Sequence, residues 1–392
     1  MKILLVHNFY GSDAPSGENE VFKAEKNLLE DNGHDVEVYI RNSDEIRNKG
    51  LFGVLRGALS VIWNPFSKFL IQKKIREFKP DVVHIHNTFP LISPSIFYAS
   101  NKKIPIVLTV HNYRLLCAAG IPMRNNAVCT QCIDKKSILP ALKYKCYRKN
   151  RLATLPIALN IAFHRKIGTW KTKVDAFIVL SDFQKNKLSV GGINPSKIHV
   201  KPNFYAGTPP IIPYNIRSDY AIFVGRLSDE KGIKTLINAW VKWGEDAPEL
   251  RIVGDGPLNS NLQLLAKNFN IKFLGQVSFD HAQFQISRSK LLILPSECYE
   301  GFPMVIREAF ALGTPVAVSN LGPLPTIVKD NENGVIFEPW QSDSLLNVVK
   351  HIWNSPDKLS ILSKGARASF ENLYNEKANY ISLMDIYKKA MK

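Results

Sequence analysis

The sequence contains no apolar run long enough to cross a membrane. A membrane-spanning helix needs about 20 mostly apolar residues, and the apolar stretch at residues 3–6 is far shorter and leads into His7. The same stretch is too short for the core of a secretory signal peptide. We therefore expect residues 3–6 to form a buried strand, and we expect the protein to be cytoplasmic.

Other signatures are also missing. There is no low-complexity tract and no repeat at the period of a solenoid. The glycines at 254 and 256 do not complete a G-x-G-x-x-G fingerprint, which disfavours a hydride-transfer enzyme. No RNP pair or helix-turn-helix signal is present, so we expect no nucleic-acid partner, although a nucleic-acid-binding protein is the alternative from another class.

Charge is distributed unevenly along the chain. The net charge is +17, but residues 1–203 hold 31 Lys and Arg against 15 Asp and Glu, and the remainder holds 20 against 19. One half is thus strongly basic and the other nearly neutral. This asymmetry indicates an anionic partner for the first half, or simply a surface that favours solubility.

Strand and helix patterns alternate twice along the 392 residues. Strands separated by helices predict parallel sheets, and the proline-rich stretch 205–218 interrupts them as a linker. We predict an α/β protein with a first domain at 1–204, completed by a C-terminal helix at about 373–392, and a second domain at 219–372. The expected strands are 2–7, 35–40, 81–85, 104–109, 176–180 and 198–201, then 221–224, 249–253, 271–274, 291–294 and 315–318.

The most informative segment is PSECYEGFPMVIREAFALGTPV at residues 295–316. A tight turn at 301–303 opens a helix, and a helix N-terminus suits a phosphate group. Glu300 precedes the turn, where a carboxylate can accept hydrogen bonds from sugar hydroxyls. Glu308 lies two helical turns further on, within reach of a ribose. The pattern favours a nucleotide-sugar site over an amphipathic helix with two surface glutamates.

This segment resembles the signature of glycosyltransferase family 4, whose members are retaining enzymes of the GT-B fold. Further pieces match in order: FVGRL at 223–227, EKG at 230–232, VGDGP at 253–257 and FLG at 273–275. The resemblance covers nearly the whole chain. It implies two Rossmann-like domains that face a cleft, a nucleotide-sugar co-substrate and no catalytic cofactor.

The resemblance also implies roles for individual residues. Arg226 and Lys231 would bind the donor diphosphate and replace a divalent cation, so we expect metal-independent catalysis. Glu300 would contact the transferred sugar and Glu308 the ribose. The turn residues Gly301, Phe302 and Pro303 complete the expected donor site.

In the first half, the resemblance makes His111 the catalytic histidine that contacts the donor sugar. His111 follows the strand expected at 104–109. The loop at residues 11–20 resembles the family's glycine-rich loop after the first strand, but Ser16 stands where the family pattern has the first of two glycines. Gly17 and Glu18 are assigned to this loop or to acceptor binding. His84 and His86 are interpreted as structural or as lining the acceptor site.

Four of the five cysteines cluster, with the spacing C-x11-C-x2-C-x13-C. In a cytosolic protein this spacing suggests a structural zinc, the alternative being four unconnected small residues. The expected ligands are Cys117, Cys129, Cys132 and Cys146.

Basic and apolar residues are interleaved at 133–173 and again at 51–78. The first stretch holds eleven Lys and Arg and one acid, Asp134. Such mixtures suit a peripheral membrane protein on an anionic surface, here the inner face of the cytoplasmic membrane, or else ordinary core helices with solvated faces.

We therefore expect a retaining hexosyltransferase that uses a nucleotide-diphosphate sugar. The expected acceptor is a lipid-linked glycan in lipopolysaccharide, O-antigen or capsule biosynthesis. A soluble sugar or sugar phosphate is the alternative acceptor.

Overall fold

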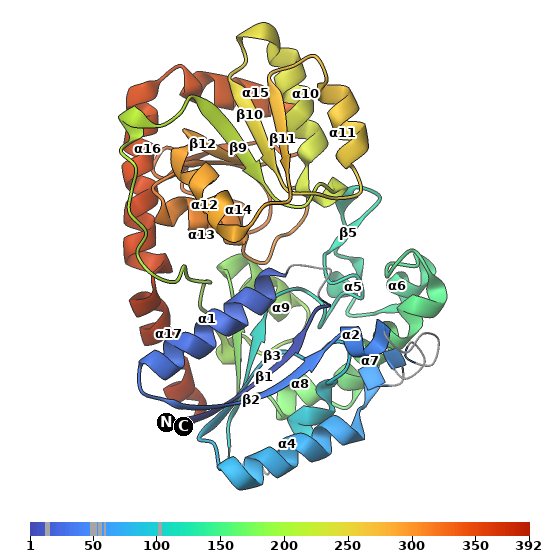
Figure 1. Ribbon diagram of the computed structural model, residues 1–392. Coiled ribbons are helices and arrows are strands. Elements are labelled where there is room, and N and C mark those ends of the chain that lie inside the picture. Colours follow the sequence, from blue (N-terminus) through green and yellow to red (C-terminus); the bar gives the residue numbers. More distant parts are fainter. Residues whose placement is uncertain (12–15, 48–52, 54–56, 59, 101–103) are drawn as a thin grey trace. The chain divides into compact units, whose positions relative to one another are not determined.

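The computed structural model describes residues 1–11, 16–47, 53, 57–58, 60–100 and 104–392 (Figure 1). The chain forms two compact units. Unit 1 comprises Met1–Pro122, Thr130–Pro202 and Asn379–Lys392, and unit 2 comprises Met123–Cys129 and Asn203–Ala378. Part of the basic stretch expected at 51–78, including Phe52, Leu55 and Arg56, lies outside the described residues.

Unit 1 is built on a six-stranded sheet in the order β2-β1-β3-β4-β7-β8, and every pairing in it is parallel. Its central strands are buried along most of their length because helices cover both faces of such a sheet. β1, for example, holds six consecutive buried residues. The strands are β1 (Lys2–Phe9), β2 (Asp35–Asn42), β3 (Val82–Asn87), β4 (Ile106–Val110), β7 (Ala176–Val179) and β8 (Ile198–Val200).

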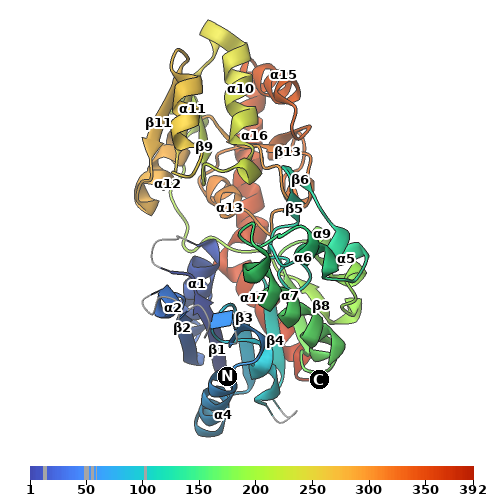
Figure 2. The same cartoon turned by 90° about the vertical axis from the view of Figure 1, so that its right-hand side faces the viewer.

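The helices of unit 1 include the last helix of the chain. Leu383, Ile386 and Tyr387 of α17 (Glu376–Ala390) are buried in one core cluster with Ile3 and Leu5 of β1. Figure 2 shows the ribbon of α17, in red, together with the strands of this unit. Its other α-helices include, among the described residues, α1 (Gly17–Asp31), α2 (Asp44–Arg47), α4 (Pro65–Phe78), α5 (Gln131–Asp134), α6 (Leu139–Lys143), α7 (Arg151–Lys166), α8 (Thr169–Thr172) and α9 (Asp182–Val190).

Unit 2 contains a second parallel sheet in the order β11-β10-β9-β12-β13-β14. Taken in chain order its strands run 3-2-1-4-5-6, the order of a Rossmann domain, which reverses between β9 and β12. Ligands of such sheets bind at the carboxyl ends of the strands beside this reversal. The strands are β9 (Tyr220–Val224), β10 (Glu249–Val253), β11 (Ile271–Gly275), β12 (Leu291–Leu294), β13 (Val316–Ser319) and β14 (Gly334–Phe337).

Helices cover this second sheet and enclose a large apolar core around Trp240 and Phe223. They are α10 (Ile233–Trp243), α11 (Asn259–Ala266), α12 (Phe279–Arg288), α13 (Met304–Ala311), α14 (Leu324–Ile327), α15 (Ser342–Trp353) and α16 (Pro356–Ser369). A short hairpin of β5 (Met123–Arg124) and β6 (Ala127–Val128) also groups with unit 2, where Trp340 Nε1 donates to the Asn126 carbonyl at 3.1 Å.

These two sheets confirm the predicted α/β fold with two Rossmann-like domains. Among the described residues, no helix combines the length and the apolar character needed to cross a membrane.

Candidate functional site

In unit 2, two glycine-containing turns meet at the carboxyl ends of β9 and β10. Gly254 has a φ of +128°, and a Cβ at this position would lie 2.0 Å from the Gly225 carbonyl oxygen. The Gly225 N–H donates to the Val253 carbonyl at 3.0 Å. Only glycine permits both this backbone conformation and this close approach. The two turns therefore place the backbone of Arg226 at the carboxyl-terminal end of the sheet. The Arg226 side chain is exposed.

Lys231 and Glu300 form an ion pair at the reversal of strand order in the same sheet. Their Nζ and Oε1 atoms are 2.7 Å apart, and the Ser296 hydroxyl donates to the same Oε1 at 2.7 Å. Gly232 makes this approach possible, because a Cβ there would lie 1.8 Å from the Pro295 carbonyl oxygen. The loop after β9 thus packs directly on the end of β12.

The Lys231 side chain keeps its positive charge in this position. Burial alone would lower the pKa of Lys231, but the Glu300 carboxylate raises it above its ordinary value. Burial raises the pKa of the neighbouring Cys298 thiol, and Glu300 adds to the effect. Cys298 is therefore a neutral thiol with little nucleophilic character.

Helix α13 begins directly after the turn at 301–303. Phe302 is buried, and its ring packs against Tyr374 with centroids 5.5 Å apart. Glu308 is buried on this helix and accepts a hydrogen bond from Gln283 Nε2 at 3.0 Å. Burial raises the pKa of Glu308, and Arg307 opposes this effect. The expected donor-site residues Gly301, Phe302, Pro303 and Glu308 thus lie on one turn and one short helix.

In unit 1, His111 directly follows β4 and is buried. Its Nε2 lies 3.1 Å from Nδ1 of His86, which comes from the adjacent strand β3. Burial lowers the pKa of His111 well below its ordinary value, and the nearby His86 and His7 add to the effect. The His111 ring is therefore neutral.

Gly17 is the first residue of α1, and the next residue, Glu18, lines the same pocket as His111. Asn112 Nδ2 donates to Glu18 Oε1 at 2.7 Å, and burial raises the pKa of Glu18. The structure thus brings Glu18 and His111 together. Residues 12–15 of the glycine-containing loop lie outside the described residues.

This pocket is lined entirely by unit 1. In the described part of the chain, four buried polar atoms of its lining residues have no hydrogen-bond partner: Glu18 Oε2, Arg114 Nε, Asn160 Oδ1 and Trp170 Nε1. Such atoms are costly to bury unless water or a ligand satisfies them. The other lining residues are Val61, His86, Asn87, Thr88, Phe89, Pro94, Leu108, Thr109, Val110, His111, Asn112, Leu115 and Ile161.

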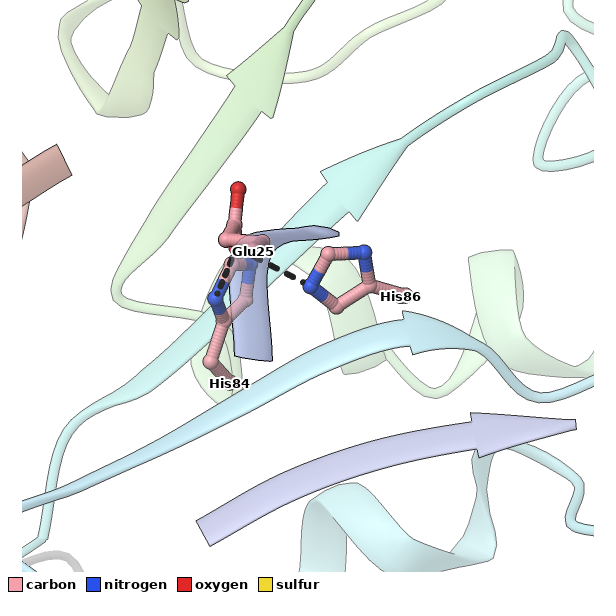
Figure 3. A group of neighbouring side chains, drawn as sticks. All are labelled: Glu25, His84 and His86. Atoms are coloured by element: carbon pink, nitrogen blue, oxygen red, sulfur yellow. Dashed lines mark hydrogen bonds and ion pairs between the residues drawn. The ribbon is translucent and has the colours of Figure 1, made fainter. Parts of the chain in front are cut away.

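A buried charged network adjoins this pocket through His86, and Figure 3 shows three of its members, Glu25, His84 and His86. Among the described residues, Glu25, His84 and His86 form the set of potential metal ligands whose atoms all lie within 4.8 Å of one another. However, Lys201 Nζ lies 2.7 Å from Glu25 Oε2. This ammonium group already compensates the carboxylate, so the cluster fits a lysine better than a metal ion.

The remaining members of this network all have partners. His84 lies between Thr109 Oγ1 and the Tyr387 hydroxyl, each at 2.7 Å. Burial alone would raise the pKa of Glu25, but Lys201 and the two histidines hold it well below its ordinary value. Sequence reasoning missed Glu25 and Lys201, because neither belongs to a recognisable motif.

The four clustered cysteines are not in disulfides. Cys132 and Cys146 contribute to a small apolar cluster in unit 1, whereas Cys129 belongs to the segment that groups with unit 2. Among the described residues, they do not form a set of converging metal ligands like the one around Glu25. The zinc site therefore stays a prediction.

Comparison with known families gives two matches that together span most of the chain. The family described as Glycosyltransferase Family 4 matches residues 25–205, and the family described as Glycosyl transferases group 1 matches residues 213–369. An uncharacterized glycosyltransferase of Methanocaldococcus jannaschii is 25% identical over 92% of this chain and 91% of its own length. The alpha-monoglucosyldiacylglycerol synthase of Acholeplasma laidlawii is 25% identical over 81% of this chain and 79% of its own.

Solved structures show the same fold. A glycosyltransferase from Rickettsia africae superimposes with a TM-score of 0.70 at 18% identity, covering 100% of this chain and 98% of its own. HepE of Anabaena, crystallised with UDP, superimposes with a TM-score of 0.65 at 18% identity, covering 99% of this chain and 100% of its own.

Proposed function

We propose that this chain, which belongs to glycosyltransferase family 4, is a retaining enzyme. It would transfer a sugar from a nucleoside-diphosphate sugar to a glycan acceptor. The observation that carries the donor site is the Lys231–Glu300 pair at the strand-order reversal of unit 2. A Rossmann-like sheet binds its ligand at this edge.

The charges at this edge suit a leaving nucleoside diphosphate. Breaking the bond between sugar and phosphate builds negative charge on the diphosphate. Lys231, the exposed Arg226 and the N-terminus of α13 supply fixed positive charge and N–H donors for it. We assign this task to them and not to a divalent cation, and we propose that the donor phosphate takes the acceptor proton in a front-side attack.

The carboxylates and the histidine would orient the donor. The Glu300 carboxylate pairs with Lys231 and can accept hydrogen bonds from hydroxyls of the transferred sugar. Glu308 can accept hydrogen bonds from the ribose hydroxyls once the hydrogen bond from Gln283 Nε2 is partly replaced. His111 would contact the donor sugar from unit 1, with Gly17 and Glu18 on the acceptor side of the same unit.

Nucleoside diphosphates offer the direct test of the donor site. A ligand that binds the folded state raises its thermal stability. We expect one of UDP, GDP or ADP to raise the melting temperature of the protein, with UDP favoured by the complex of the similar HepE fold. CMP and NAD are the controls. If no nucleoside diphosphate and no nucleotide sugar shifts the melting temperature, the donor-site proposal is wrong.

Helix α7 supports a membrane-associated, lipid-linked acceptor. Its apolar side chains at 152, 155, 159 and 163 recur at helical spacing and are exposed, Leu152 to 80%. The opposite face is also apolar and packs into unit 1 through Ile157 and Ile161. A surface helix ordinarily exposes a polar face, so α7 presents apolar side chains that a bilayer surface can bury.

Basic residues surround this exposed apolar face. Lys149, Arg151 and Lys166 are exposed at its two ends. Exposed apolar and cationic side chains together suit an anionic lipid surface. One similar protein is named a glucosyldiacylglycerol synthase. A lipid-linked glycan is therefore our proposed acceptor, with a soluble sugar or sugar phosphate as the alternative.

Vesicle binding tests this surface. We expect the protein to sediment with phosphatidylcholine vesicles that contain phosphatidylglycerol, and the double change Leu152→Asp with Leu159→Asp to weaken binding on the order of 10- to 100-fold, because two apolar side chains lose their burial. Leu264→Asp is the matched control, since Leu264 is equally exposed but lies on α11 of unit 2. Equal loss in the control, or binding only to duplex DNA with a steep salt dependence, would contradict the membrane surface.

A further inference from the structure

Behind His111, a chain of buried hydrogen bonds runs from the pocket to a lysine. His111 Nε2 is 3.1 Å from His86 Nδ1, and His86 Nε2 is 3.1 Å from Glu25 Oε1. Glu25 Oε2 accepts a hydrogen bond from Lys201 at 2.7 Å, and Lys201 also donates to Asn379 Oδ1 at 3.1 Å. Glu25 lies on α1 and His86 on β3, whereas His111 and Lys201 directly follow β4 and β8.

The direction of each hydrogen bond follows from the carboxylate. Glu25 is ionised and can only accept, so His86 must donate from Nε2. Lys201 already balances the charge of Glu25, so His86 needs no second proton to do so. A neutral His86 that donates from Nε2 has a lone pair at Nδ1, and Nε2 of His111 must then carry the proton that this lone pair accepts.

We propose that Glu25 and His86 act as positioning residues that hold His111 in its Nε2–H tautomer, so that Nδ1 accepts a hydrogen bond from a sugar hydroxyl. His111 lines the pocket, and in the described part of the chain its Nδ1 has no protein partner. A histidine whose second nitrogen is held by a fixed partner presents a defined edge to its ligand. This inference rests on the proposed glycosyl transfer, because that function supplies the hydroxyl.

The tautomers can be measured without any substrate. Long-range 1H–15N correlation NMR of the whole protein, labelled at the histidine ring nitrogens, distinguishes Nδ1–H from Nε2–H rings. The changes His86→Gln and His111→Gln assign the two signals. We expect both rings to be neutral with the proton on Nε2. A proton on Nδ1 of His111 would overturn the proposal, and this measurement requires no folded variant of Glu25.

Glu25→Gln tests the causal link. The glutamine keeps the shape of the side chain, but its NH2 group can donate to His86 Nε2. His86 would then carry its proton on Nδ1, and His111 would accept at Nε2 and carry its own proton on Nδ1. Two references accompany this test. Glu30→Gln removes a carboxylate from the exposed face of the same helix, where it pairs with Lys26, and His164 is an internal standard, because its Nε2 donates to the Ile62 carbonyl at 2.9 Å.

The kinetic consequence separates positioning from simple stability. With the wrong tautomer, Nδ1 of His111 can no longer accept from the sugar, so kcat should fall about tenfold or more, roughly the effect of one lost hydrogen bond, while KM for the donor changes less. Glu30→Gln should leave both unchanged. An unchanged His111 tautomer in Glu25→Gln overturns the inference even if transfer is observed. Wild-type protein without transfer activity would instead contradict the proposed function, and the tautomer of His111 would still be decided by NMR.

Discussion

Lys231→Ala should reduce the rate of glycosyl transfer by about 10²–10³-fold, the usual cost of removing one group that stabilises developing charge. The ammonium group of Lys231 lies 2.7 Å from the Glu300 carboxylate. When the donor binds at this strand-order reversal, the same ammonium group would face the diphosphate. Without it, the leaving group loses a fixed positive charge in a partly buried site.

Lys234→Ala is the matched control for this change. Lys234 lies three residues further along and pairs with Asp229 at 2.8 Å, but both side chains are largely exposed. An exposed pair of this kind contributes little to stability or to the field at the site. We expect Lys234→Ala to retain near-normal kcat/KM with the nucleotide sugar.

Glu300→Ala should also remove activity, since the transferred sugar loses its carboxylate partner. Circular dichroism and thermal melting of all three variants check that each is folded. Near-normal turnover in folded Lys231→Ala or Glu300→Ala would show that the donor is bound elsewhere.

The roles of Lys231 and Glu300 could be predicted from the sequence, but the contact between their side chains could not. Each lies in a segment that resembles a family motif, and the segments are separated by about 70 residues. Their contact follows from the strand order of unit 2, which places β12 beside β9 and not beside β11, its predecessor in the chain. Strand order depends on how helices pack on the two faces of the sheet. From a single sequence it can be inferred only by analogy with known folds.

The network behind His111 was beyond sequence reasoning for a different reason. Glu25 lies in a helix that is rich in Lys and Glu, where a carboxylate ordinarily faces water. Only the packing of α1 against the sheet shows that Glu25 is fully buried, and only the position of Lys201 after β8 shows how its charge is balanced. Such a pair brings together residues 176 positions apart without any local pattern.

Helix α7 is an intermediate case. Its apolar residues predicted either a buried core helix or a membrane-facing surface. The structure shows that one face of the helix is buried and the opposite face is exposed, with Ile157 on the first and Leu159 on the second. The sequence could not separate these faces, because apolar residues occur at both sets of helical positions.

Lys201→Met should destabilise the protein by about 3–5 kcal/mol, the cost of leaving one charge of a buried pair without its partner. The side chains of Lys201 and Glu25 are only 2% and 1% exposed. In the variant, Glu25 must either stay ionised without compensation or take up a proton. Urea unfolding beside the wild type measures the loss.

The destabilisation should depend on pH. In the wild type the pKa of Glu25 is held well below its ordinary value, so the carboxyl contributes stability above the ordinary glutamate pKa, and this contribution is lost as pH falls toward the folded-state pKa. In Lys201→Met, burial without a cation raises the pKa of Glu25, and the unfavourable charge disappears on protonation. The difference between wild type and variant should therefore be largest near pH 7 and should shrink as the medium is acidified toward pH 4.

Lys26→Met isolates the effect of burial. Lys26 and Glu30 are joined at 2.6 Å, nearly the distance in the buried pair, but their side chains are 32% and 39% exposed. Water solvates both ions when the partner is lost, so the expected change is below about 1 kcal/mol. A loss in Lys201→Met as small as in Lys26→Met would mean that water reaches Glu25. In that case water could lie between Glu25 and His86, and the direct hydrogen bond that sets the tautomer of His111 in our proposal would be absent.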